Sequence, residues 1–140
     1  MTSPQNFNLF VYGSLRSGFK SPAYDYITRY FDFVSDGKVR GYLYDLGEYP
    51  AALPTTDDAF IVGELYVARD RGQFDYVIAQ LDDYEGVTPE PGETALYNRI
   101  LSEIETEKGT VSAWVYWYNG NITDRPIVES GDIMEYLKNK

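Results

Sequence analysis

Apolar residues with helical spacing follow Asp70. They recur every three or four residues and therefore share one face of a helix. These residues are Phe74, Val77, Ile78 and Leu81. The glycines and prolines between positions 86 and 92 are unfavourable for a continued helix. The pattern predicts an amphipathic helix that begins at Asp70, ends near Asp83 and packs one side on a sheet.

The longest alternating pattern lies towards the end of the chain. Apolar and polar residues alternate over residues 96–106 and again over residues 110–118, as in strands with one buried face. The turn residues Glu107, Lys108 and Gly109 separate the two runs. These segments predict an antiparallel β-hairpin.

Shorter apolar runs predict the other strands. We expect them at residues 7–12, around residues 33–34, at residues 39–44 and at residues 61–67. Asp36 and Gly37 are typical turn residues and are predicted to separate the second run from the third. Residues 47–50 are predicted to form a turn with Tyr49 at its tip, followed by an irregular stretch to residue 58.

Two more helices are predicted near the ends of the chain. Ser21 is placed to cap a helix with Pro22 at its first position, and this helix is expected to end at about Tyr30. Residues 130–137 are predicted to form a short capped helix.

The order of these elements favours the α+β class. Helices interrupt the strands without the regular spacing of a doubly wound sheet, and the last strands pair locally. At least six strands in so small a chain would leave exposed edges unless the sheet curls into a small mixed β-barrel or half-barrel. We therefore predict one α+β domain over residues 1–140.

Composition and charge narrow the class of protein. The 140 residues are 44% hydrophobic and 24% charged, which fits one globular domain with its own core. Twelve basic and 22 acidic residues give a net charge of −10, which disfavours nucleic acid and acidic membranes as partners. Residues 1–6 lack the basic and apolar regions of a signal peptide, so a cytoplasmic protein is expected.

Two residue types are absent from the sequence. It contains no cysteine and no histidine. This excludes disulfides, thiolate and imidazole metal sites, and Ser-His or Cys-His nucleophile pairs. Acid–base chemistry therefore depends on a carboxylate, a lysine or a tyrosine.

An apolar strand leads directly into the glycine loop Tyr12-Gly13-Ser14-Leu15. Gly13 allows a sharp turn, after which backbone amides can approach an anion such as a carboxylate. The loop lacks the Gly-Lys-Ser/Thr sequence that holds nucleotide phosphates. It either binds a different anion or simply turns the chain.

Three carboxylates crowd the predicted C-terminal end of the Asp70 helix, at Asp82, Asp83 and Glu85. The helix dipole places partial negative charge there, and neighbouring acids repel one another. A buried carboxyl among them is expected to have a raised pKa, which suits a general base. A cluster of acids exposed to solvent is the alternative.

Several motifs occur in an order that resembles the gamma-glutamylcyclotransferase-like family, and within it the small branch of gamma-glutamylamine cyclotransferases, AIG2-like and BtrG-like proteins. The resemblance covers nearly the whole chain. The motifs are Tyr12-Gly13-Ser14-Leu15, Gly41-Tyr42-Leu43-Tyr44 with Tyr49-Pro50, Val62-Gly63-Glu64-Leu65-Tyr66, Leu81-Asp82-Asp83-Tyr84-Glu85-Gly86, Tyr97-Asn98-Arg99 and Ala113-Trp114-Val115-Tyr116.

This resemblance implies a small mixed β-barrel with flanking helices and a cavity beside the glycine loop. The family's catalytic carboxylate falls on Glu85. Its substrate-binding loop falls on Tyr12, Gly13, Ser14 and Leu15, whose amides hold the α-carboxylate of the substrate. Several members of the small branch have threonine where this chain has Ser14, a difference that keeps the hydroxyl.

The implied reaction needs no cofactor, metal or protein nucleophile. The α-amine of a γ-glutamyl compound attacks its own γ-carbonyl, which closes 5-oxoproline and expels an amine. The protein folds the substrate into a reactive conformation and moves one proton, a role that falls to Glu85. The expected partner is a small γ-glutamyl molecule.

Some roles stay open from the sequence. Tyr49, Tyr97 and Tyr116 are candidates for the cavity wall, with Tyr116 assigned to substrate binding, although strand packing also accounts for them. Arg99 can pair with a carboxylate or contact a ligand. A non-catalytic binding or regulatory protein with the same cavity is the alternative function. The sequence specifies neither the leaving amine nor the oligomeric state.

Overall fold

The computed structural model describes residues 7–12, 22–46, 50–85, 97–120 and 122–138. These residues form six strands and three α-helices. In chain order, the elements are β1 (Asn8–Val11), α1 (Pro22–Tyr30), β2 (Phe31–Asp45), β3 (Pro50–Pro54), β4 (Phe60–Ala68), α2 (Phe74–Glu85), β5 (Tyr97–Thr106), β6 (Gly109–Tyr118) and α3 (Ile133–Lys138).

The strands form a closed mixed barrel. Their order is β3-β2-β4-β1-β6-β5, and a further pairing of β2 with β5 closes the ring of β2, β4, β1, β6 and β5. β1 is parallel to β6, whereas the other neighbours are antiparallel. The predicted α+β barrel is confirmed.

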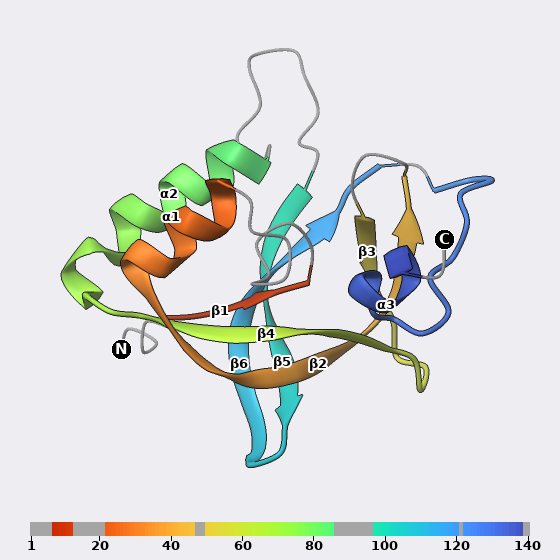
Figure 1. Ribbon diagram of the computed structural model, residues 1–140, viewed down its shortest axis with the longest axis horizontal. Coiled ribbons are helices and arrows are strands. Elements are labelled where there is room, and N and C mark those ends of the chain that lie inside the picture. Colours follow the sequence, from red (N-terminus) through yellow and green to blue (C-terminus); the bar gives the residue numbers. More distant parts are fainter. Residues whose placement is uncertain (1–6, 13–21, 47–49, 86–96, 121, 139–140) are drawn as a thin grey trace.

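Two apolar clusters lie on opposite faces of the strands. In β1, Leu9 and Val11 belong to a cluster shared with residues of α1 and α2. Phe10 points the other way, into a cluster that includes residues of β2, β4, β5, β6 and α3. Figure 1 shows α1 and α2 on the same side of the strands and α3 beside β3. The period of two along each strand therefore separates the barrel interior from the layer under α1 and α2.

The backbones of β4 and β1 lie unusually close together at Gly63. A Cβ atom at Gly63 would lie 2.3 Å from the carbonyl oxygen of Val11 and 2.6 Å from a ring carbon of Phe10. Any other residue at this position would separate the two strands.

The prediction of two strands joined by a turn at Asp36 and Gly37 is wrong. β2 is a single strand of 15 residues, in which Asp36 pairs with Glu64 and Gly37 pairs with Gly63. A Cβ atom at Gly37 would lie 2.9 Å from Ile104. The glycine therefore allows β2 and β5 to approach where the barrel closes, and does not make a turn.

The prediction of an irregular stretch after residue 50 is also wrong in part. Residues Pro50–Pro54 form β3, which pairs with the second half of β2. A proline at each end of the strand suits its place at the edge of the sheet, where backbone donors are not all needed. Ala51 and Ala52 are fully buried. Tyr49, predicted at the tip of a turn, lies outside the described residues.

The predicted helices are confirmed, with shifted ends. Asp70 caps a short 3₁₀ turn by accepting a hydrogen bond of 2.9 Å from the backbone N–H of Gly72, and α2 follows from Phe74. α2 continues to Glu85, two residues beyond the predicted end. Ser21, the predicted cap of α1, lies outside the described residues. In the described part of the chain, no helix has the length and apolar character needed to cross a membrane.

Tyr26 of α1 carries a buried hydroxyl oxygen with no hydrogen-bond partner in the described structure. Burial raises the pKa of this tyrosine, and the nearby Tyr30 and Tyr76 raise it further. Its ring packs on Tyr30 at a centroid distance of 4.9 Å. The ring thus stabilises the fold, while the hydroxyl opposes it.

We predict that Tyr26→Phe increases the free energy of unfolding by about 1 kcal/mol, because it removes a desolvated hydroxyl and keeps the ring. Urea unfolding of the two proteins measures the difference. Tyr76→Phe is the control, because the Tyr76 side chain is exposed and should leave the free energy of unfolding unchanged. A less stable Tyr26→Phe protein would contradict the prediction.

Candidate active site

The structure describes some of the predicted site residues and not others. Gly13, Ser14 and Leu15 lie outside the described residues. Glu85 is the last residue of α2, and only its backbone is described. Tyr12 and Tyr116 are described in full, and both are buried.

Asp82 is the best-defined polar group at this end of α2. Its carboxylate accepts a hydrogen bond of 2.7 Å from Arg99 Nε at Oδ1 and one of 3.1 Å from Arg99 Nη2 at Oδ2. The hydroxyl of Tyr116 donates to the same Oδ1 at 2.9 Å. Asp82 is only 8% exposed, so these bonds replace water around a buried charge.

Strand pairing explains why these residues meet. Arg99 of β5 and Tyr116 of β6 are direct partners in the hairpin, so their side chains project from the same face. That face is the one that α2 covers, because Tyr116 belongs to the apolar cluster shared with α1 and α2. The guanidinium of Arg99 also lies over the ring of Trp114, 4.6 Å from its centre.

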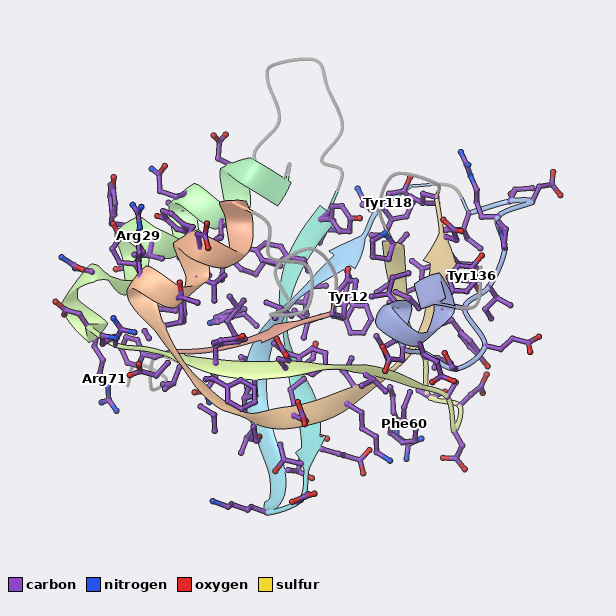
Figure 2. All side chains as sticks on the ribbon, in the orientation of Figure 1. Tyr12, Arg29, Phe60, Arg71, Tyr118 and Tyr136 are labelled. Atoms are coloured by element: carbon purple, nitrogen blue, oxygen red, sulfur yellow. The ribbon has the colours of Figure 1, made fainter. Side chains whose placement is uncertain are left out.

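Tyr116 connects this network to the start of the glycine loop. Its backbone carbonyl accepts a hydrogen bond of 2.5 Å from the hydroxyl of Tyr12. Tyr12 follows the last residue of β1 and directly precedes Gly13. Figure 2 shows its ring beyond the end of β1, on the side of the molecule where α3 and Tyr136 lie.

A second buried carboxylate lies across β1 from this network. Glu64 of β4 pairs with Val11 and is 7% exposed. Its Oε1 accepts a hydrogen bond of 3.1 Å from the hydroxyl of Tyr66. A groove of about 350 Å³ passes beside both residues. The end of β1 is therefore flanked by polar groups on both neighbouring strands.

The hydrogen bonds show the roles of Arg99 and Tyr97, which the sequence left open. Arg99 pairs with a carboxylate, and the hydroxyl of Tyr97 donates to the carbonyl of Pro50 at 2.8 Å, which ties β5 to β3. Asp83 is exposed, whereas Asp82 is buried. Asp82 is four residues after Ile78, and residues four apart lie on the same face of a helix. The burial of Asp82 could therefore have been predicted from the helical period.

Sequence reasoning did not single out Glu64 as a polar group of the site. It lies between apolar residues of a strand, and period-two alternation marks every second position as facing away from the barrel interior. The second layer, under α1 and α2, turns that face into a buried one. Within the described residues, no three acidic side chains are grouped closely enough to hold a metal ion.

Comparison with known families gives a consistent result. The family model described as "Gamma-glutamyl cyclotransferase, AIG2-like" matches residues 9–135. The chain belongs to this family. The match includes both the glycine loop and the end of α2, so the AIG2-like resemblance of the motifs is confirmed.

Two named relatives are each 32% identical to this AIG2-like chain over the aligned residues. The gamma-L-glutamyl-butirosin B gamma-glutamyl cyclotransferase of Niallia circulans is 32% identical over 114 residues, which are 80% of this chain and 67% of the relative. The gamma-glutamylcyclotransferase family protein YtfP of Escherichia coli is 32% identical over 128 residues, 91% of this chain and 96% of the relative.

Solved structures have the same fold. The solution structure of E. coli YtfP matches with a TM-score of 0.62 at 30% identity, over 95% of this chain and 99% of that protein. YkqA of Bacillus subtilis matches with a TM-score of 0.69 at 24% identity and shows the fold alone. That match covers 97% of this chain, which spans 44% of the length of YkqA.

We predict that Arg99→Leu lowers the free energy of unfolding by about 3 kcal/mol, because it leaves the buried Asp82 carboxylate without its counter-charge. Replacing both residues by leucine should recover much of this loss, since no unpaired charge then stays buried. Urea unfolding of the two single variants and the double variant gives the coupling free energy.

The exposed pair Arg40–Asp58 provides the matched control. Its ions lie 2.7 Å apart, as do the closest atoms of Arg99 and Asp82, but the side chain of Asp58 is 91% exposed. Its coupling free energy should be below about 1 kcal/mol. Equal coupling free energies in the two pairs would contradict the prediction that burial strengthens the coupling between Arg99 and Asp82.

Proposed function

We propose that this protein is a cofactor-independent γ-glutamyl cyclotransferase that acts on a γ-glutamyl amine. Membership of the AIG2-like family supports the class of reaction, as does the activity for which the Niallia circulans relative is named. The observation that carries most weight is that Tyr12, the residue before Gly13, and Asp82, near the end of α2, are bonded to the same residue. Tyr116 bonds to Tyr12 on one side and to Asp82 on the other.

The proposed reaction is an intramolecular aminolysis. The α-amine nitrogen of the substrate forms a bond to its own γ-carbonyl carbon, and the bond from that carbon to the leaving nitrogen breaks. The products are 5-oxoproline and a free amine, in equal amounts. Because the substrate supplies the nucleophile, a chain without cysteine or histidine can perform the reaction.

Glu85 is the proposed general base and acid. It takes a proton from the α-ammonium, which frees the nitrogen lone pair for attack, and returns that proton to the leaving nitrogen. The attacking nitrogen loses a second proton as the lactam forms, and this proton also goes to the leaving nitrogen, so that the amine is released as an ammonium ion. Its place at the end of α2, three residues after the buried Asp82, supports this assignment.

The loop Tyr12-Gly13-Ser14-Leu15 is the proposed site for the substrate α-carboxylate. Backbone amides after a glycine suit an anion, since no Cβ blocks their approach. The described end of this loop is firmly placed, because Tyr12 is buried and bonded to β6. The proposal requires that a carboxylate held here places the neighbouring α-amine next to Glu85.

Release of products from a panel of γ-glutamyl compounds tests the proposal. The parent protein is incubated with γ-glutamyl derivatives of lysine, of simple amines and of aminoglycosides, and mass spectrometry measures 5-oxoproline and free amine. We expect equal amounts of both products from at least one amine, with or without a strong chelator. Binding without either product across the panel would favour the alternative, a non-catalytic binding or regulatory protein.

We predict that Glu85→Gln lowers kcat by about a hundredfold to ten-thousandfold, because the amide keeps the size of the side chain but cannot accept a proton. Asp83→Asn is the matched control: it makes the same chemical change two residues earlier, at an exposed position, and should keep the parent rate. Steady-state assays compare the three proteins. A Glu85→Gln protein with the parent rate would assign the base to another group.

The same proteins give a pH test. The parent kcat/KM should fall as acidic pH protonates the base. The residual activity of Glu85→Gln should lose this acidic limb, whereas Asp83→Asn should keep it. A limb that persists unchanged in Glu85→Gln would show that a different group titrates.

A further inference from the structure

We propose that Tyr116 is a positioning residue that fixes the last turn of α2 relative to Tyr12 at the end of β1, acting through a bond to Asp82 on one side and a bond to Tyr12 on the other. The assignment of Glu85 as the group that is positioned rests on the function proposed above. The sequence assigned Tyr116 to direct contact with substrate. Its bonds in the structure point to a different role, because both join parts of the protein to each other.

Two hydrogen bonds of Tyr116 connect it to different segments. Its side-chain hydroxyl donates to Asp82 of α2, and its backbone carbonyl accepts from the hydroxyl of Tyr12. The residue is only 3% exposed, so water competes little for either bond. A single residue of β6 therefore sets the distance between the two segments that would hold base and substrate.

Asp82 gives the helix end a fixed anchor. A carboxylate near the C-terminus of a helix is opposed by the helix dipole, so its burial needs a counter-charge. Arg99 supplies it through two nitrogens, while Tyr116 donates a third bond to the carboxylate. Three donors on two oxygens hold the plane of the carboxylate, and with it the turn that carries Asp82.

The position of this anchor matters because helix ends fray. The last turn of a helix lacks several of its backbone hydrogen bonds and opens more readily than the middle. Position 85 comes three residues after Asp82, within the same last turn of α2. An error of about 1 Å in the place of a catalytic group can cost about a hundredfold in rate.

Loss of either of these two bonds of Tyr116 is expected to change a different kinetic parameter. Tyr116→Phe removes the bond to Asp82 but keeps the carbonyl that Tyr12 uses, so kcat should fall by about tenfold to a hundredfold with KM within about threefold of the parent value. Tyr12→Phe removes the bond at the start of the loop. It should raise KM by about tenfold with a smaller effect on kcat.

Tyr136→Phe is the matched control. The hydroxyl of Tyr136 donates to Asp45 at 2.9 Å, the same distance as the bond from Tyr116 to Asp82. Tyr136 lies on α3, away from α2, as Figure 2 shows. This variant loses an equivalent tyrosine–aspartate bond and should keep both kcat and KM.

Hydrogen exchange of the backbone amides tests the anchor without reference to activity. In Tyr116→Phe, the amides of residues 82–85 should exchange about tenfold faster than in the parent, while those of residues 74–78 change little. Tyr136→Phe should leave both groups unchanged. If the parent protein converts no γ-glutamyl compound, the proposed function fails, and this measurement alone decides whether Tyr116 anchors the helix end.

Arg99→Lys covers the case in which Tyr116→Phe folds poorly. Lysine keeps the counter-charge of Asp82 but cannot form the two parallel bonds, so an intermediate loss of kcat and intermediate exchange are expected. The proposal is overturned if Tyr116→Phe keeps the parent kcat, or if exchange at residues 82–85 is unchanged. It is also overturned if Tyr116→Phe raises KM alone, which would make Tyr116 a substrate contact, or if Tyr136→Phe loses kcat equally.

Discussion

The buried carboxylate of Asp82 is the interaction on which the arrangement of the candidate site depends. A charge that is 8% exposed is costly unless it is paired, and Arg99 and Tyr116 together supply the donors. The energetic requirement fixes geometry as well, since Asp82 can keep its partners only if α2 lies against β5 and β6 at one register. The helix end that carries Glu85 is located by this requirement.

The barrel provides the frame for that contact. β1 is buried on both faces, one in the interior and one under α1 and α2, so it contributes Leu9 and Phe10 to different clusters. Closure depends on glycines where strands cross closely, as at Gly63 and Gly37. The parallel pairing of β1 with β6 then places the end of β1 level with Tyr116, two residues beyond the pair Leu9 and Trp114.

The chemistry proposed for this site asks little of the protein beyond such placement. The substrate carries its own nucleophile, so a carboxylate and a set of backbone amides can suffice if their separation is correct. The sequence contains no cysteine or histidine, which is consistent with a reaction in which the substrate supplies the nucleophile. Rigid placement through buried tyrosines and a salt bridge is then the main contribution of the fold.

The sequence by itself determined the helices, the last hairpin, the α+β class and the family motifs, because period, turn residues and spacing are local properties. It could not determine that Asp36 and Gly37 lie within one long strand, since their strand pairing is with residues such as Glu64 and Gly63, distant in the chain. Nor could it determine that Asp82 is the buried acid with Arg99 as its partner. Burial and pairing come from contacts between distant segments, so only the tertiary structure decided them.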